Sequence, residues 1–562
     1  MILRRIARVA VLSIVCVAAL CNASLLLAQP ASADADPVAQ AIAAELDAWT
    51  TAGEPTIHGA RIALPERVQE FYTRRGFRAA WDNARNAEQL HRALAESFEE
   101  GLDPQDYHLS LLEELSHQIA GPAATDALRA QYDVLLTEAL LRLAYHLSFG
   151  KVDPQTFDAQ WNYGRTLASM DVAREVETAL AAEDIYQRVE ALRPAHSLYT
   201  GLKHELARYR AAAETPTTAI ATGSTLRPGT SDARVPALRA RLIASGDLDQ
   251  TAASDSLDYD AALEAAVRSF QARMGLANDS VIGADTIAEL NVPIADRIRQ
   301  LRVNLDRGRV LLHDLPDEFV IVNIAAFRVY FVRGQQIVWQ ARAQVGKPYR
   351  RTPIFRSAIS YVVLNPTWTV PPGIIEKDIL PAAQQDPAAI TRKGLQVLDK
   401  DGREVDPASV DWSRYRSGHI PYTLRQDPGP GNALGRVKLM FPNPYLVYLH
   451  DTPSQSLFDE PERAFSSGCV RVERALELTE LVLDDPEHWN AASIASTVEH
   501  GDLRTVTLKQ NVPVLLTYWT AWVDPQGRPN FRRDIYGQDA KWAQALEAHF
   551  TVRARPLFQS AP

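Results

Sequence analysis

The sequence is organised around Ser466-Ser467-Gly468-Cys469-Val470-Arg471, near its C-terminal end. The segment Val447-Tyr448-Leu449-His450-Asp451 lies 19 positions upstream. Cys469 is the last of three cysteines, and the other two, Cys16 and Cys21, lie in an N-terminal segment that we expect to be removed. A lone thiol that follows a small, flexible Ser-Ser-Gly segment, with a histidine shortly before it, predicts a nucleophile.

The N-terminal segment predicts export. Arg4, Arg5 and Arg8 precede an apolar run over residues 9–27, and the small-residue cleavage pattern Ala31-Ser32-Ala33 follows. This order is typical of a secretory signal peptide, which we place at residues 1–33. An uncleaved membrane anchor is the alternative, because the run approaches the ~20 residues that span a bilayer.

Export makes the isolation of Cys469 informative. In an oxidising compartment a single thiol is a liability unless it is buried or used. A buried structural cysteine is the plain alternative. However, the Ser-Ser-Gly approach is polar and typical of a turn, whereas a core cysteine usually lies within an apolar strand or helix. The flanks therefore favour a functional thiol.

Length and composition limit the number of domains and the possible classes of protein. A chain of 562 residues is too long for one core, so we expect about two to four domains. The hydrophobic content of 46% and the charged content of 23% are typical of globular proteins. A net charge of −10 without a long Lys/Arg run argues against nucleic acid as a partner. The 13 histidines are scattered and no H-E-x-x-H motif occurs, so we expect no metal and no cofactor.

The N-terminal part of the chain is predicted to be a helical scaffold domain over residues 38–215. Apolar residues recur there at helical spacing, most clearly over residues 127–147. Its aromatic residues could line a ligand groove, but we expect them to form core. They are Phe71, Tyr72, Trp81, Tyr107, Trp161 and Tyr163. A linker rich in Ala, Thr, Pro, Gly and Ser follows over residues 211–230.

Residues 226–293 are predicted to hold three short helices. The first has the pattern A-L-R-x-x-L from Ala237, the second A-V-x-x-F-Q from Ala266, and the third G-x-x-T-x-x-x-L-N from Gly283. In this order the segment resembles a peptidoglycan-binding domain of the three-helix type. Whether such a domain binds glycan or only supports its neighbours is left open by the sequence.

After a connecting helix at residues 295–311, the apolar period changes to two, which predicts a mostly β domain over residues 316–525. Strands are expected at 319–324, 328–332, 336–345, 357–364, 437–441, 445–450 and 512–523. Residues 373–432 interrupt this pattern without regular strands, which predicts a functional lid or insertion. We expect a helix over residues 470–483 and a C-terminal extension over residues 526–562.

The residues around Cys469 suggest how it is activated. The thiolate is the reactive form, and a neighbouring imidazole and a helix N-terminus each lower a cysteine pKa from about 8.5. We expect His450 to end a strand and Cys469 to open a helix. Tyr448 shares a strand face with His450. The amides of Gly468 and Cys469 would form an oxyanion hole, and Arg471 would hold a substrate carboxylate.

Together these pieces resemble the L,D-transpeptidases with a YkuD-type catalytic domain, and in particular the large YcbB-like members. The resemblance is carried by His450-Asp451-Thr452-Pro453, Ser467-Gly468-Cys469-Val470-Arg471 and Tyr518-Trp519-Thr520-Ala521-Trp522-Val523. Many members have a second histidine where this chain has Ser467, and a glycine where it has Asp451. Neither departure removes the nucleophile or the base.

The resemblance implies an α+β multidomain protein. Its mostly β catalytic domain would be a sheet or sandwich with an inserted lid, next to the helical scaffold and the three-helix domain. Cys469 is implied as the nucleophile and His450 as the general acid/base. The residues implied in oxyanion or substrate binding are Gly468, Ser467, Tyr448, Arg471 and Trp368. Trp412, Tyr415 and His419 would either shape substrate access or pack within the insertion.

The implied reaction is a two-step 3→3 cross-linking of peptidoglycan, with release of the terminal D-Ala from a tetrapeptide stem. The implied partners are peptidoglycan stem peptides and other cell-wall synthesis enzymes. Contact with the inner membrane is expected only if the signal segment stays uncleaved. The implied location is the periplasm of a Gram-negative-type bacterium.

Two alternative functions stay open at this point. A cysteine L,D-carboxypeptidase or amidase would use the same thiol, but water would resolve the thioester. A non-catalytic cell-wall-binding protein would use only the three-helix domain, although the intact pair of His450 and Cys469 argues against it. A papain-like protease is disfavoured because its cysteine precedes its histidine in the chain.

Overall fold

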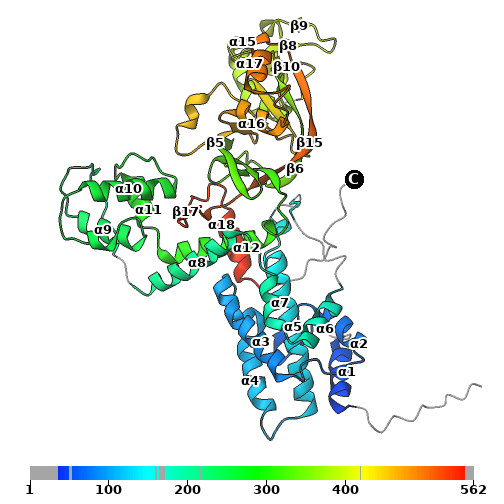
Figure 1. The fold of residues 1–562 in the computed structure, drawn as a ribbon. Helices are drawn as coiled ribbons and strands as arrows, with labels where there is room; N and C mark the ends of the chain where they lie inside the picture. Colours follow the sequence, from blue (N-terminus) through cyan, green and yellow to red (C-terminus); the bar gives the residue numbers. More distant parts are fainter. Residues whose placement is uncertain are drawn as a thin grey trace, which may run out of the picture.

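The structure, a computed structural model, describes residues 36–49, 54–157, 161–163, 171–215, 218–417 and 419–550. The expected signal peptide and the last 12 residues of the expected C-terminal extension lie outside these ranges. Figure 1 shows three lobes: one helical, one small with three helices, and one built on a large sheet. The expected α+β multidomain class is thereby confirmed. Within the described ranges no helix is long and apolar enough to cross a membrane.

The helical lobe is built around α5 (Asp126–Phe149). The side chain of Thr125 accepts a hydrogen bond from the N–H of Leu128 and so caps the start of this helix. Nearly every residue of α5 from Ala130 onward is buried, so the other helices surround it. The further elements of this lobe are α1 (Pro37–Trp49), β1 (Thr56–Ile57), β2 (Ala60–Arg61), α2 (Pro65–Arg74), α3 (Ala84–Glu96), α4 (Leu109–Ile119), α6 (Val172–Ala182), α7 (Ile185–Ala191) and α8 (Ser197–Ala213).

The aromatic residues that the sequence assigned to core are buried. This set comprises Phe71, Tyr72, Trp81, Tyr107, Trp161 and Tyr163. Trp161 and Tyr163 pack in a second core that joins the scaffold to the rest of the molecule. These rings therefore stabilise the fold rather than line a groove.

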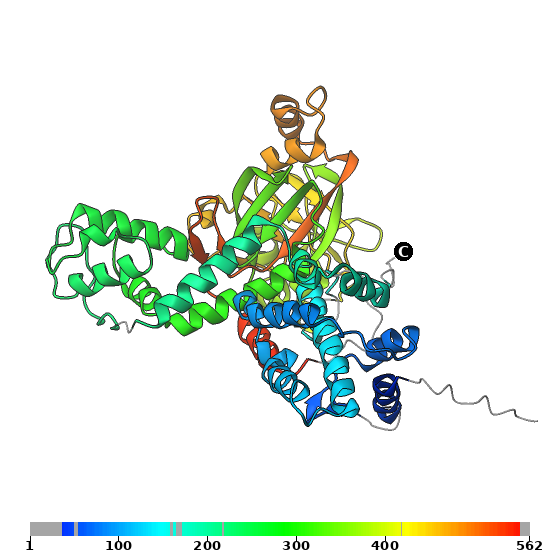
Figure 2. The same cartoon turned by 60° about the horizontal axis from the view of Figure 1, so that its bottom comes forward.

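Helix α12 (Ile294–Leu311) connects the lobes. It lies along α8 in both views of the molecule (Figures 1 and 2) and also contacts α18 (Gln538–Glu547). The buried carboxylate of Asp306 accepts hydrogen bonds from the N–H groups of Lys151 and Val152, at 2.8 and 3.2 Å, and from Nε1 of Trp542 at 2.9 Å. The small lobe before it consists of α9 (Val235–Ala244), α10 (Ala261–Met274) and α11 (Ala284–Leu290).

The sheet lobe is a nine-stranded sheet in the order β13-β5-β14-β12-β11-β6-β15-β3-β4. Strand β4 also pairs with β5, so the sheet closes on itself. Its strands are β3 (Glu318–Asn323), β4 (Arg328–Arg333), β5 (Gln336–Gly346), β6 (Phe355–Leu364), β11 (Val437–Met440), β12 (Leu449–His450), β13 (Ala464–Ser466), β14 (Val470–Val472) and β15 (Arg504–Thr517). Helices α16 (Ala475–Leu483) and α17 (Ala491–His500) come between β14 and β15 in the chain. The side chains enclosed by these elements form one apolar core.

The insertion differs from the expectation. Strands β8, β9 and β10 lie within residues 373–432, where no regular strands were expected, and join β7 (Trp368–Thr369) in a four-stranded sheet of order β7-β10-β8-β9. Strand β7 comes just before the insertion, whose elements are α13 (Pro372–Ile374), a π-helical turn (Ile375–Ile379), α14 (Leu380–Gln385), α15 (Ala388–Arg392), β8 (Gln396–Leu398), β9 (Glu404–Val405) and β10 (Thr423–Gln426). Each strand has two to four residues, too few to show an alternating pattern in the sequence.

Three other expected elements also differ. The helix expected at 470–483 is strand β14 followed by α16, because Arg474 takes a left-handed φ of 55° between them. The strand expected at 445–450 is reduced to β12, because Leu446 has a φ of 57°. The closing strand expected at 512–523 is two strands: β15 ends at Thr517, and β16 (Ala521–Val523) pairs with β17 (Pro529–Phe531).

Candidate active site

Two short parallel strands bring the predicted nucleophile and base together. Strand β12 pairs with β14 so that Leu449 lies opposite Val470 and His450 opposite Arg471. The N–H of Val470 donates to the carbonyl of Tyr448 at 3.1 Å. Cys469 directly precedes β14, so its place in this register is next to Tyr448. Residues 19 positions apart in the chain thus lie on adjacent strands.

The turn that carries Cys469 is held by side chains, and the expected helix N-terminus is absent. The hydroxyl of Ser466 accepts from the N–H of Gly468 at 3.1 Å and donates to the carbonyl of Cys469 at 2.5 Å. Gly468 has a φ of 125°, a conformation that favours glycine. Helix α16 begins only at Ala475, so its dipole cannot act on the thiol as expected, since the dipole effect is confined to the first turn.

A second set of hydrogen bonds, made by Thr352 and Tyr536, supports this turn. The Thr352 hydroxyl donates to the carbonyl of Gly468 at 2.8 Å and accepts from the N–H of Gly346 at 2.9 Å. The hydroxyl of Tyr536 accepts from the N–H of Thr352 at 3.1 Å and donates to the carbonyl of Gly346 at 2.6 Å. Tyr536 belongs to the C-terminal extension, so this segment helps to position the nucleophile turn.

To serve as the expected oxyanion donor, the N–H of Gly468 would have to leave its present hydrogen bond. Its N–H is already bound to the Ser466 hydroxyl. The Ser467 hydroxyl, which is exposed, accepts a hydrogen bond from Nη1 of Arg350 at 2.9 Å.

His450 is buried and held in a single tautomer. Its Nδ1 lies 2.5 Å from the carbonyl oxygen of Asp451. A carbonyl only accepts hydrogen bonds, so Nδ1 carries the proton and Nε2 has the lone pair that a general base needs. Burial, together with the nearby charge of Arg471, lowers the pKa of His450 to about 3. The imidazole is therefore neutral at pH 7.

Asp451 anchors the segment after His450. Its Oδ2 accepts hydrogen bonds from the N–H and from Nε of Arg436, at 3.0 and 2.7 Å. Gln455 donates to the other carboxylate oxygen at 3.2 Å. A Cβ on Gly435 would lie 2.6 Å from Asp451, so glycine is required at that position for this approach. Asp451 thus fixes the backbone that orients the imidazole.

The surroundings of the Cys469 thiol raise its pKa, contrary to the lowered pKa that the sequence suggested. Burial raises the pKa of Cys469 to about 11, which outweighs the opposing effects of the Tyr448 backbone, Arg471 and Lys438. The Sγ atom lies 3.8 Å from the carbonyl oxygen of Leu446. The resting pair is thus a neutral thiol and a neutral imidazole.

A row of polar residues crosses the sheet at the level of His450. Lys438 lies opposite His450, His450 opposite Arg471, and Arg471 opposite Gln344. Nη1 of Arg471 donates to Oε1 of Gln344 at 3.0 Å, and Nζ of Lys438 lies 5.1 Å from the ring centroid of Tyr448. Both cations favour the thiolate form of Cys469. Sequence reasoning missed Lys438 and Gln344, although a lysine between Val437 and Leu439 was a usable signal.

The remaining predicted residues are placed as follows. The Tyr448 ring lies 6.0 Å from the His450 ring between centroids, on the shared side that the sequence predicted. Trp368 is half-buried in β7, where it pairs with Gln426 and packs on the core of the insertion. Trp412 is 2% exposed and belongs to that core. Tyr415 packs against the same core, and His419 is exposed.

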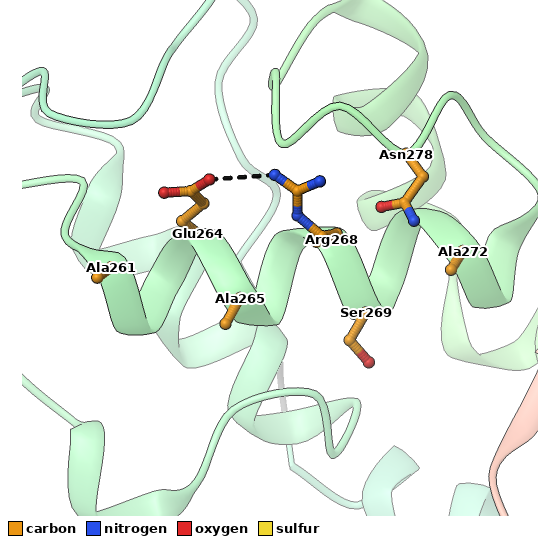
Figure 3. A pocket seen from close by; sticks show the side chains of 7 residues that line it. All are labelled: Ala261, Glu264, Ala265, Arg268, Ser269, Ala272 and Asn278. Atoms are coloured by element: carbon orange, nitrogen blue, oxygen red, sulfur yellow. Dashed lines mark hydrogen bonds and ion pairs between the residues drawn. The ribbon is translucent and has the colours of Figure 1, made fainter.

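A separate hollow of about 410 Å³ lies on the three-helix lobe. Figure 3 shows its lining along α10: Ala261, Glu264, Ala265, Arg268, Ser269 and Ala272, with Asn278 beyond. The side chains of its charged pair, Arg268 and Glu264, are 51% and 36% exposed. Among the described residues no cluster of His, Cys, Asp and Glu could hold a metal ion.

Known families match all three lobes. Residues 317–505 match the L,D-transpeptidase catalytic domain (YkuD), residues 231–290 match a domain described as "Putative peptidoglycan binding domain", and residues 66–206 match a scaffold domain. A curated protein of Haemophilus influenzae, named "Putative L,D-transpeptidase", is 36% identical over 243 residues. This match covers 43% of the chain and 48% of the relative, so the chain spans about half the length of that protein.

Two solved structures are also similar. One is the L,D-transpeptidase from Xylanimonas cellulosilytica, with 17% identity, 53% of this chain and 99% of that chain covered, and a TM-score of 0.18. The other is the Ldtfm-avibactam carbamoyl enzyme, with 11% identity, coverage of 56% and 98%, and a TM-score of 0.18. With TM-scores this low, neither likeness adds to the argument. The family matches do: residues 317–505 are similar to the L,D-transpeptidase catalytic domain of the YkuD type, residues 231–290 to a peptidoglycan-binding domain and residues 66–206 to a scaffold domain.

Proposed function

We propose that this protein is an L,D-transpeptidase that forms 3→3 peptidoglycan cross-links through a thioester on Cys469. The observation that carries this proposal is the placement of Cys469 and His450 on adjacent parallel strands, with Nδ1 of the imidazole bound to the Asp451 carbonyl so that the lone pair lies on Nε2. A neutral base next to a neutral thiol is suited to proton transfer in concert with attack on a carbonyl.

The first step acylates the enzyme. His450 Nε2 takes the proton of Cys469 as Sγ attacks the carbonyl on the L-centre of the third residue in a donor tetrapeptide. The C–N bond to the terminal D-Ala then breaks, and the imidazolium returns the proton to the leaving amine. The products are free D-Ala and a thioester on Cys469.

The second step transfers the acyl group. The side-chain amine on the third residue of another stem attacks the thioester, and His450 accepts a proton from that amine. The C–S bond breaks and the thiol is restored by the same proton. Lys438 and Arg471 offset the negative charge on sulfur whenever the thiolate forms, because both lie in the row that flanks His450.

The place and partners of the protein belong to the same proposal. The signal-like N-terminus supports export, and the matched peptidoglycan-binding domain supports the cell wall as the substrate. We therefore place the mature protein in the periplasm, where it acts on stem peptides next to other cell-wall synthesis enzymes.

Incubation of the purified protein with disaccharide-tetrapeptide, followed by mass spectrometry, tests the proposal. A cross-linked dimer that has lost one D-Ala is expected from the wild type and should be absent with Cys469→Ala. Tripeptide without dimer would favour the carboxypeptidase alternative. Unchanged substrate would leave only the wall-binding alternative.

A further inference from the structure

A second arginine, Arg350, contacts the turn that carries Cys469, although the sequence did not indicate this contact. Arg350 belongs to the loop that follows β5, and the N–H of Lys347 in this loop donates to the carbonyl of Ser466 at 3.0 Å. Nη1 of Arg350 also donates to the Ser467 hydroxyl at 2.9 Å. Ser467 is two residues before Cys469, so the guanidinium lies beside the turn that presents the thiol.

The insertion supplies the present partner of this guanidinium. Asp378, in the π-turn Ile375–Ile379, accepts from Nη2 of Arg350 at 2.9 Å through Oδ1 and from Nη1 through Oδ2. The side chain of Arg350 is only 13% exposed, whereas that of Asp378 is 41% exposed. Among the described residues, the buried Nε of Arg350 has no hydrogen-bond partner. Arg350 is therefore the more buried partner of this ion pair, and Asp378 of the insertion is the more exposed one.

Two exposed hydrophobic side chains lie near Arg350 and the turn that carries Cys469. Tyr349 and Leu446 are the most exposed large hydrophobic residues in the described part of the chain, at 72% and 71%. The carbonyl of Leu446 faces the Cys469 sulfur, and the ring of Tyr349 lies 5.7 Å from the guanidinium carbon of Arg350. The left-handed φ of Leu446 is a strained conformation of the kind that occurs at functional sites.

We propose that Arg350 binds the terminal carboxylate of the donor stem, and that Asp378 occupies this arginine as an internal stand-in until the donor arrives. This inference rests on the proposed function. The donor carboxylate can accept the same pair of hydrogen bonds from Arg350 that the carboxylate of Asp378 accepts in this structure. The terminal carboxylate belongs to the residue released by attack of Cys469, so it must bind within about one residue of the thiol, where the turn places Arg350.

Arg471, the carboxylate ligand suggested by the sequence, is less suited to this role. It is already hydrogen-bonded to Gln344 and lies in the row beside His450, where its charge acts on the thiol. Exchange of Asp378 for the donor carboxylate has a further consequence. The ion pair of Asp378 with Arg350, which joins the insertion to the loop after β5, is lost when the donor binds. Donor recognition and movement of the insertion are therefore coupled.

Kinetics with two donors test the assignment. The donors are disaccharide-tetrapeptide with a free terminal carboxylate and the same compound with a terminal carboxamide. The wild type should use the carboxylate donor with a kcat/KM about 10- to 100-fold higher, as expected for charge-assisted hydrogen bonds. Arg350→Gln should abolish this preference, and Arg350→Lys should retain part of it. Asp378→Asn should lower KM for the carboxylate donor severalfold and leave the carboxamide donor unchanged.

Matched controls come from the neighbouring residues. Arg351→Gln and Lys377→Gln change exposed charges next to Arg350 and Asp378, and both should keep the wild-type preference. Thermal melting and the iodoacetamide reactivity of Cys469 show whether Arg350→Gln retains the fold. A preference that survives in folded Arg350→Gln, or equal use of both donors by the wild type, overturns the inference alone. A wild type that turns over neither donor overturns the proposed function and the inference together.

Discussion

Alkylation of Cys469 by iodoacetamide should speed up about tenfold with each pH unit between about pH 8 and pH 10, without a plateau. Burial raises the pKa of this thiol to about 11. About one thiol in a thousand is then ionised at pH 8, against about one in four for a cysteine of pKa ~8.5. The more basic thiolate is roughly tenfold more nucleophilic. The net rate at pH 8 should therefore be roughly 20-fold below that of an unfolded cysteine peptide.

Intact-mass measurement of the alkylated fraction over time gives these rates, and protein without residues 1–33 has Cys469 as its sole cysteine. His450→Gln is the informative control. Because burial holds the pKa of His450 at about 3, the imidazole is neutral over this range and its loss should leave the alkylation profile unchanged while turnover stops. A plateau below pH 8 that disappears in His450→Gln would reveal a thiolate–imidazolium pair and refute the reasoning.

Three further predictions concern the surroundings of the thiol. Lys438→Met should raise the pKa of Cys469 and slow its alkylation at pH 9 severalfold, because a cation that favours the thiolate is lost; Lys438→Arg should not. Thr352→Val removes the hydroxyl that holds Gly468 and Gly346 and should lower the free energy of unfolding by about 1–3 kcal/mol in urea titrations, whereas Thr352→Ser should keep it. The His450 pKa is lower in the folded than in the unfolded chain, so this residue contributes stability above pH ~6.5 that is lost as the pH falls toward 3. His450→Gln should therefore show a smaller loss of Tm between pH 7 and pH 4 than the wild type.

Each of these predictions has an outcome that contradicts it. Unchanged alkylation in Lys438→Met would place the lysine too far from the sulfur to affect it. Wild-type stability in Thr352→Val would mean that water replaces the hydroxyl under the turn. An equal or larger acid-induced loss of Tm in His450→Gln would mean that the imidazole is protonated in the folded protein.

The sequence was most informative where one residue type has few uses. A single cysteine beyond the expected signal segment, reached through Ser466-Ser467-Gly468 and preceded by His450, could be linked to a proposed thiol nucleophile without a structure. The three-helix segment and the strands on both sides of the insertion were also predictable, because their apolar periods extend over many residues. These features depend on local patterns, which is what a single sequence records.

The parts that could not be predicted depend on contacts distant in the chain or on very short elements. Residues Val470–Val472 form a three-residue strand, and only the left-handed Arg474 separates it from α16, so the segment resembled one helix. The pKa of Cys469 was expected to fall, but burial by the closed sheet raises it. The row formed by Lys438, Arg471 and Gln344 comes from three separate strands and has no signature in any one of them.

The hydrogen bonds of Tyr536 make the support of the nucleophile turn depend on a late part of the chain. This tyrosine lies 67 positions after Cys469, yet its hydroxyl holds both ends of the loop beneath the nucleophile turn. A chain cut before residue 526 would keep the cysteine and the histidine but lose that support. Synthesis proceeds from the N-terminus, so the turn that carries Cys469 gains this support only after nearly the whole chain has been made.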